Sequence, residues 1–344
     1  IAFHENRLCF AGTLAEPDTV WMSKIGSFFN FDVGEAEDTD SINLVAATGD
    51  VNQIRYMVSN RDLQIFTASG ELYVPTYLNQ AITPTNAQIR KQTPYGSEFV
   101  QPASIDGATI FVQTGGRIVR EYLYTDSEDA YTSTSISTIA SHLIDEPKCM
   151  AVVHSGFGLP DSYAAITLGN GDMTLFSSNR AEKRASWTRV TTDGSFCSVV
   201  AIHDRLFANI WYNNKLQLCE FDTEVGLDKW VSGTIAANKL DVSQAFSNGD
   251  VVKVIDDDIG EFTVDSSDEI DLTGYSGTVY AGLDYTVKVI TNPVDASLGS
   301  GPATGEIRGI TNVVVDVKST KSMKVNSRPV VSSEFTGKKE VRLL

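Results

Sequence analysis

The chain has 344 residues, 42% of them hydrophobic and 21% charged, so it can bury a sizeable core and about two domains are expected. It carries 27 Lys and Arg against 44 Asp and Glu, and this net charge of −17 argues against a protein that grips nucleic acid through clustered cations. No apolar run approaches the roughly 18 residues that predict a membrane-spanning helix.

The four cysteines form no metal-binding or redox motif. They lie far apart and show neither a C-x-x-C pair nor the Cys/His spacing of a zinc site. Two disulfides could form, but in a chain of this length we expect buried free thiols, which fits assembly in a reducing compartment. These residues are Cys9, Cys149, Cys197 and Cys219.

Short β-branched and aromatic segments, separated by turn residues, predict antiparallel β-structure along most of the chain. In four places two such segments flank a residue pair that tolerates positive φ angles, as tight hairpins require. Four successive hairpins are therefore expected. They join residues 63–67 to 71–74 through Ser69-Gly70, 109–113 to 117–120 through Gly115-Gly116, 163–168 to 173–176 through Asn170-Gly171, and 205–210 to 216–221 through Asn213-Asn214.

The hairpins recur at intervals that suggest a structural repeat. They start at Leu63, Thr109, Ala164 and Arg205, which are 46, 55 and 41 residues apart. Propeller blades recur roughly every 40 to 50 residues, and radial packing covers the faces that a single blade leaves open. The expected fold is all-β, with β-propeller-like blade repeats. Because the spacing is irregular, a β-sandwich stays open as the alternative.

Two features interrupt the repeats. Residues 135–144 place apolar side chains near helical spacing, preceded by Ser and Thr, so one short helix is predicted there, ending before Pro147. From about Leu240 the strands become shorter and alternate between apolar and polar residues, which predicts an additional small β-barrel or sandwich domain. The expected strands are residues 251–255, 261–264, 279–281, 285–290, 310–317 and 323–325.

Three regions are therefore expected. Residues 1–239 form a β-propeller-like domain, residues 240–330 a small antiparallel β domain, and residues 331–344 a strand that returns to the main body. Ile1 already lies in strand-like sequence, and Leu344 falls inside an apolar pattern. We therefore expect the chain to be part of a longer polypeptide and the propeller-like domain to be incomplete in it.

Catalytic and metal-binding signatures are missing from the sequence. There is no P-loop, no G-x-S-x-G elbow and no H-E-x-x-H motif, and the four histidines form no local ligand pair, so we expect hydrogen-bonded structural histidines. The acidic turn Asp256, Asp257 and Asp258 lacks the ligand order of a calcium loop. It is either a solvated turn or a set of carboxylates at a pore or subunit contact. No catalytic, cofactor-binding or metal residue is predicted, and no cofactor.

Motifs in the N-terminal region are more distinctive. The chain reads His4-Glu-Asn-Arg-Leu-Cys-Phe-Ala-Gly12, then Val20-Trp-Met-Ser-Lys24 and Gly26-Ser-Phe-Phe-Asn-Phe31. In this order the motifs resemble the tail nozzle proteins of podoviruses (short-tailed bacteriophages), a family also described as tail tubular protein B or packaged-DNA stabilisation proteins. The resemblance runs from residue 4 to about residue 290. It continues through Ile65-Phe-Thr67, Gly70-Glu71, Tyr95-Gly96, Phe111-Val-Gln113, Trp187 and Val279-Tyr-Ala-Gly-Leu-Asp-Tyr285.

The resemblance implies a structural protein of the virion tail and no enzyme. Its subunits are expected to form a homo-hexameric ring below the portal and adaptor, a DNA conduit that retains and then ejects the genome. Implied partners are the tail adaptor and tail fibre proteins and, transiently, double-stranded DNA; contact with the host cell envelope is compatible, as is assembly in the host bacterial cytoplasm. An acidic lumen would let phosphate slide without ion pairs, although such a charge can also serve solubility alone.

Two other hypotheses remain open. The first is a tail-associated carbohydrate-binding or polysaccharide-degrading propeller, since aromatic residues such as Trp21, Trp211, Tyr212 and Trp230 could stack on sugars. The second is a receptor-binding module without enzymatic activity.

Overall fold

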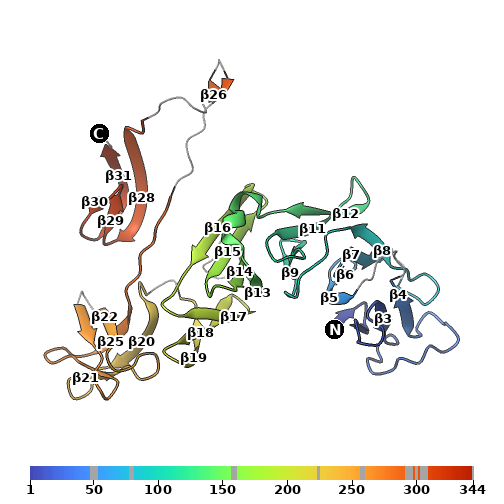
Figure 1. The fold of residues 1–344 in the computed structure, drawn as a ribbon, viewed down its shortest axis with the longest axis horizontal. Helices are drawn as coiled ribbons and strands as arrows, with labels where there is room; N and C mark the ends of the chain where they lie inside the picture. The colour runs from blue at the N-terminus through green and yellow to red at the C-terminus, as the bar shows by residue number, and fades with distance from the viewer. Residues whose placement is uncertain are drawn as a thin grey trace. The chain divides into compact units, whose positions relative to one another are not determined.

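The computed structural model describes residues 1–46, 53–76, 81–155, 161–222, 225–255, 260–290, 297–298, 301–302 and 309–342. These residues are nearly all β, with 31 strands and a single 3-10 helix among them (Figure 1). The chain divides into two compact units, Ile1–Tyr285 and Thr286–Leu344. No helix in the described part of the chain is long and apolar enough to span a membrane.

Five antiparallel sheets follow one another along the first unit, each with its strands in sequence order. Sheet 1 holds β1 (Ala2–His4), β2 (Arg7–Ala11), β3 (Thr19–Met22) and β4 (Ile42–Val45), and sheet 2 holds β5 (Ile54–Ser59), β6 (Leu63–Thr67), β7 (Glu71–Val74) and β8 (Arg90–Thr93). Sheet 3 holds β9 (Ala103–Ile105), β10 (Ala108–Val112), β11 (Val119–Thr125) and β12 (Ala130–Ser135). Sheet 4 holds β13 (Pro147–Val153), β14 (Ser162–Leu168), β15 (Met173–Asn179) and β16 (Arg184–Val190), and sheet 5 holds β17 (Ser195–Ile202), β18 (Arg205–Tyr212) and β19 (Lys215–Glu220).

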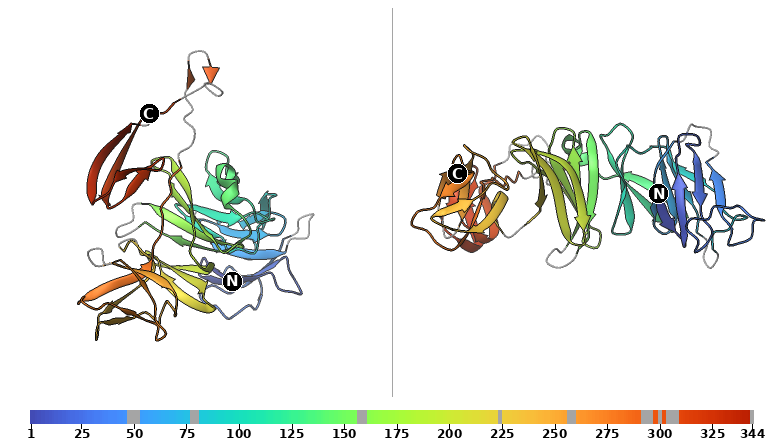
Figure 2. Two further views of the ribbon diagram at one scale, coloured as in Figure 1. Left: turned by 60° about the vertical axis from the view of Figure 1, so that its left-hand side comes forward. Right: turned by 90° about the horizontal axis from the view of Figure 1, so that it is seen from below.

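Successive sheets pack face to face, and the layers between them form the core. Figure 2 shows the sheets of this unit following one another in chain order, from blue to yellow. Sheets 1 and 2 enclose Met22 and Ile65, sheets 2 and 3 an aromatic layer, sheets 3 and 4 Ile110 and Ile166, and sheets 4 and 5 Val153 and Leu206. Side chains alternate between the two faces of a strand, so a strand covered on both faces carries apolar side chains on both. β6, β7 and β10 are buried at every residue.

All four predicted hairpins are present, as β6–β7, β10–β11, β14–β15 and β18–β19. Three of them use positive φ angles, at Gly115 and Gly116, at Gly171, and at Asn213 and Asn214. The turn at Ser69-Gly70 differs, since the Thr67 hydroxyl accepts hydrogen bonds from the amides of both residues. This side-chain cap closes the turn without left-handed backbone.

The predicted helix is shorter than expected and is not an α-helix. It is a 3-10 helix, Thr138–Leu143, and residue 135 belongs to β12 instead. Ala140 interrupts it with φ −122°, and Ser137 makes no side-chain cap. The Ser137 hydroxyl accepts the Val119 amide at 3.0 Å instead. The Ser137 side chain therefore stabilises the edge of sheet 3. The helical pattern is too short to form a stable α-helix.

The first unit ends in a further β-body. Its sheet has the order β20 (Asp228–Thr234), β25 (Thr278–Leu283), β22 (Val251–Ile255) and β23 (Gly260–Thr263), and a second pair joins β21 (Lys239–Asp241) to β24 (Glu269–Asp271). Val252, Val279 and Phe246 form its core. The prediction of a strand at residues 285–290 is wrong. The alternating pattern is there, but these residues pair with no described strand and Val287 and Ile290 are exposed.

The second unit is a small set of antiparallel pairs. β28 (Asn312–Thr320) pairs with β31 (Phe335–Arg342), and β29 (Met323–Val325) pairs with β30 (Arg328–Val331). β26 (Ser297–Leu298) and β27 (Gly301–Pro302) form a two-residue pair. Val331 is buried in this unit, whereas most of its other described side chains are half-buried or exposed.

A fully buried arginine in sheet 1 forms hydrogen bonds to four backbone carbonyls of neighbouring segments. The Arg7 guanidinium donates to the backbone carbonyls of Ser23 at 2.7 Å, Asp40 at 2.5 Å, Asp38 at 2.9 Å and Ile82 at 3.1 Å. These carbonyls belong to segments up to 75 residues away in sequence. One cation therefore satisfies four buried or half-buried acceptors of irregular backbone, which β-pairing leaves free.

Arg7→Met should cost about 3 to 5 kcal/mol of unfolding free energy, because it leaves these carbonyls without a donor in a dry layer. Urea unfolding measures the change. Arg117→Met is the matched control, since Arg117 is exposed and pairs only with Asp145 at 3.2 Å, and it should cost less than about 1 kcal/mol. Equal losses in the two variants would contradict the structural role given to Arg7.

Candidate functional site

The predicted acidic turn, Asp256, Asp257 and Asp258, lies outside the described residues. Among the carboxylates that follow this turn in the sequence, Asp265 and Glu269 form ion pairs. The Lys239 amine lies 2.8 Å from both Asp265 and Glu269, and its hydrogen bond lowers the pKa of Asp265. No group of three or more potential ligands that could hold a metal ion occurs in the described part of the chain.

The acidic run after Phe31 divides into exposed and buried members. Glu35, Glu37 and Asp38 are exposed, whereas Asp40 is buried. Asp40 pairs with Lys24 at 2.8 Å and accepts the Glu37 amide at 3.0 Å. The hydrogen bond from Lys24 lowers the pKa of Asp40. This carboxylate therefore stabilises the loop around Arg7, and its three neighbours face solvent.

The histidines and cysteines have no catalytic arrangement. His4 is buried between the hydroxyls of Ser59 at 2.9 Å and Thr76 at 3.2 Å, which confirms a hydrogen-bonded structural role for this residue. All four cysteines are free thiols, as expected. Only Cys9 is buried, and burial raises its pKa to about 12, so it is unreactive at neutral pH. Cys197 is exposed, contrary to the expectation of buried thiols.

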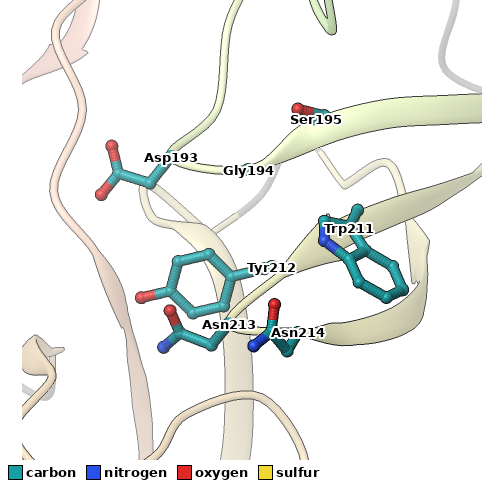
Figure 3. A pocket seen from close by; sticks show the side chains of 7 residues that line it. All are labelled: Asp193, Gly194, Ser195, Trp211, Tyr212, Asn213 and Asn214. Carbon is teal, nitrogen blue, oxygen red and sulfur yellow. The ribbon is translucent and has the colours of Figure 1, made fainter.

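An open depression lies where the start of β17 meets the β18–β19 turn (Figure 3). The Trp211 ring extends to one side, and Tyr212 and Asp193 extend to the other. Gly194 is required at its base, because an added Cβ would lie 2.4 Å from the Trp211 carbonyl oxygen. No histidine lines it, and among the described residues no hydrogen bond joins the Ser195 hydroxyl to Asp193, the carboxylate in the same lining. The lining is Asp193, Gly194, Ser195, Trp211, Tyr212, Asn213 and Asn214.

A buried lysine connects this depression to the β-body that follows it. The Lys229 amine lies 2.9 Å from the centroid of the Tyr212 ring, and it has no hydrogen-bond partner among the described residues. Its side chain is 8% exposed. Burial lowers the pKa of Lys229, and the nearby charge of Asp228 partly offsets this effect. The contact is therefore a cation–π interaction between β20 and sheet 5, made at the cost of desolvating the amine.

Lys229→Met should unfold at an equal or higher urea concentration than the wild type at pH 7, because a neutral side chain of similar length avoids the desolvation. The folded pKa lies below the unfolded one. The unfolding free energy of the wild type should therefore rise as the pH increases toward the ordinary lysine pKa of about 10.4. Over the same pH range, the advantage of Lys229→Met over the wild type should shrink.

The exposed Lys183 gives the control, and Lys183→Met should change the unfolding free energy by less than about 0.5 kcal/mol at pH 7, because removing an exposed lysine relieves no burial. A loss above about 2 kcal/mol in Lys229→Met at pH 7 would mean that the ring contact outweighs desolvation.

A buried carboxyl group lies between sheets 2 and 3. Glu71 is fully buried, the Thr93 hydroxyl donates to its Oε2, and its Oε1 has no partner among the described residues. The Tyr122 hydroxyl also has no hydrogen-bond partner among the described residues. The Tyr122 ring stacks on Tyr131 with ring centroids 4.5 Å apart. Burial raises the pKa of Glu71, and the Thr93 hydrogen bond and the Arg120 charge oppose this only in part.

Glu71→Gln should therefore raise the unfolding free energy at neutral pH. A carboxyl group whose folded pKa is raised stabilises the protein below its unfolded pKa of about 4.3, and this stability is lost as the pH rises through the folded pKa. The advantage of the variant should disappear in acid. Urea titrations between pH 4 and pH 8 measure it.

Glu98→Gln should behave oppositely and serves as the control. Burial opposes ionisation of Glu98, but hydrogen bonds from the Phe99 and Gly115 amides keep its pKa lowered. Its replacement should cost stability at neutral pH and cost less in acid. The same sign in both variants would contradict the assignment of Glu71.

Sequence reasoning missed three of these residues. Arg7 and Glu71 stand in motifs noted for their family resemblance, but nothing in the sequence indicates that either is buried. Lys229 stands in no motif at all. Each becomes visible only through contacts between sheets, such as that of Lys229 with Tyr212.

The solved structures offer only distant similarity. Apo AztD from Citrobacter koseri matches with 10% identity and a TM-score of 0.30, over 78% of this chain and 62% of that one. BBS1N, from a complex with ARL6DN, matches with 11% identity and a TM-score of 0.34, over 82% and 89%. This chain thus spans less than two thirds of the AztD chain. Neither likeness carries an argument about function.

The sequence comparisons are more informative. No curated protein matches the chain. Residues 1–226 match the family described as bacteriophage nozzle protein, and this stretch contains all of sheets 1 to 5. The match confirms the resemblance seen in the N-terminal motifs and covers well over half of the sequence. The chain therefore belongs to the bacteriophage nozzle protein family, and it is a structural component of the phage tail.

Proposed function

We propose that copies of this chain form the ring-shaped tail nozzle, a DNA conduit below the portal and adaptor that retains the genome and then ejects it. The family match of residues 1–226 carries the proposal. It is supported by the continuous packing of sheets 1 to 5, which suits a rigid wall.

The five sheets are proposed to be blades of a β-propeller. Each is an antiparallel meander packed against the next one in the chain. The outer face of sheet 5 remains open and apolar: Val200 is 50% exposed and Leu218 is 72% exposed, and Ile202, Trp211 and Leu216 lie on the same face. A radial array covers both faces of every sheet, so a further sheet belongs there. The propeller is then incomplete in these residues.

The predicted domain boundaries stay part of the proposal. Residues 1–239 would be the propeller-like domain, 240–330 the small β domain, and 331–344 a strand returning to the main body. The contacts divide the chain after Tyr285, and the β20–β25 pairing joins residues 228–234 to residues 278–283.

The proposed conduit works by electrostatic repulsion. The net charge of −17 makes carboxylates the dominant surface groups, and carboxylates lining the lumen would form no ion pairs with phosphate. Beyond a Debye length of about 8 Å at physiological salt the repulsion is screened, so it acts only close to the wall. DNA would therefore slide along the passage with little friction.

The proposed assembly is a homo-hexamer in the virion tail, put together in the host cytoplasm. It would contact the tail adaptor and the tail fibre proteins, and at its tip the host cell envelope. Double-stranded DNA would be a transient partner during packaging and ejection.

A carbohydrate-binding role is the second candidate. Trp211 is 48% exposed and lines the same depression as Asp193 and Asn214, and an indole ring, a carboxylate and an amide can together bind the ring face and hydroxyls of a sugar. Incubation with host envelope polysaccharide tests it. Retained polysaccharide would favour binding, and released oligosaccharide would favour degradation.

Electron microscopy of assembled particles tests the leading proposal. A closed six-fold ring is expected, with DNA-sized passage and an axial surface dominated by carboxylates, because phosphate must pass without pairing. Mass measurement of the purified assembly should give six copies. A ring whose axial surface is basic would overturn the sliding mechanism, and a protein that stays monomeric at every concentration would overturn the ring.

A further inference from the structure

The two compact units carry charge of opposite sign. Residues 1–285 hold 18 Lys and Arg and 39 Asp and Glu, a net of −21, whereas residues 286–344 hold 9 and 5, a net of +4. Together these give the −17 of the whole chain. The second unit is therefore basic, although the chain as a whole is acidic.

The basic residues of the second unit concentrate at one hairpin. We define the basic hairpin as residues 318–333, which contain β29, β30 and the end of β28. Its turn, Asn326-Ser327, has φ angles of 47° and 67°, the left-handed values of a tight two-residue hairpin. No acidic residue occurs between Val317 and Glu334. Its four cations, all exposed, are Lys318, Lys321, Lys324 and Arg328.

Many cations of the first unit have a carboxylate partner. Arg180 pairs with Glu121, Arg189 with Asp172, and Arg205 with Glu220. Further pairs join Arg61 to Asp126, Arg184 to Asp161 and Lys253 to Asp284. That unit also carries a large excess of carboxylates over cations, which repels phosphate.

We propose that the basic hairpin binds the phosphate backbone of duplex DNA. Exposed Lys and Arg are interspersed there with Ser322, Asn326, Ser327, Ser332 and Ser333, the side-chain types that hydrogen-bond phosphate oxygens. A protein partner is less suitable, because protein interfaces are depleted in Lys and Ser and enriched in aromatic residues. The contact is independent of base sequence, since it uses phosphates alone.

This inference rests on the proposed function, because the conduit is what makes duplex DNA the relevant polyanion. It adds a local attraction to an otherwise repellent wall. An acidic first unit and a basic hairpin would keep DNA from sticking along most of the path while holding it weakly at one place. Repetition in a ring multiplies a weak contact without requiring any one copy to bind tightly.

Binding of a fluorescent 30-base-pair duplex to the full chain, followed by anisotropy at several salt concentrations, tests the contact. Each phosphate neutralised contributes about 0.9 to the slope of log K against log salt. The triple variant Lys318→Gln, Lys321→Gln and Lys324→Gln should therefore lower the slope by about 2 to 3. The triple Lys→Arg variant at these positions keeps the charge and should bind like the wild type.

The matched control removes three exposed lysines of the first unit, Lys148→Gln, Lys183→Gln and Lys215→Gln, and should change the slope little. An equal effect of both Gln triples would overturn the proposal, as would a wild type that fails to bind duplex at low salt. Sedimentation without DNA covers the remaining case: if the hairpin triple alters self-association, the hairpin contacts another copy and the proposal is wrong. Ring imaging reports separately on the nozzle assignment.

Discussion

Face-to-face packing of sheets is the constraint on which the rest of the first unit depends. A short antiparallel meander cannot bury both of its faces alone, and sheets 2, 3 and 4 are apolar on both. Sheets 2, 3 and 4 are therefore each stabilised by a neighbour on both faces, so we expect the five sheets to unfold together. Sheet 5 differs, because no sheet among the described residues covers its outer apolar face, where Leu218 is 72% exposed.

The layers between the sheets are not uniformly apolar, and their polar groups are satisfied in different ways. Arg7 is solvated by backbone carbonyls alone, while Lys229 has only the face of Tyr212. Glu71 keeps one oxygen without a described partner, so its protonated form is favoured. The contacts that these residues make favour one alignment of the neighbouring segments over others. Such fixed alignment would suit the rigid wall of the proposed conduit.

Local features of the fold could be predicted from the sequence, and long-range ones could not. The hairpins followed from strand pattern and turn chemistry, as at Asn213-Asn214, because both act within a few residues. The strand expected at residues 285–290 failed because an alternating pattern says nothing about whether a partner strand is available. The bond from Arg7 to Ile82 spans 75 residues, and the contact of Lys229 with Tyr212 depends on how two β-bodies meet. The acidic turn Asp256–Asp258 stays a prediction, as it lies outside the described residues.

Charge is the property that would connect this fold to the proposed DNA conduit. A strongly acidic chain repels phosphate at short range, which lowers friction but gives no hold on the genome. A uniformly basic chain would do the reverse, because counterion release strengthens with every phosphate engaged and would arrest DNA along the whole wall. Separating −21 and +4 between two units of one chain would satisfy both requirements of the proposed conduit. It does so without a dedicated binding cleft, since a β-hairpin with a positive-φ turn presents side chains outward at little structural cost.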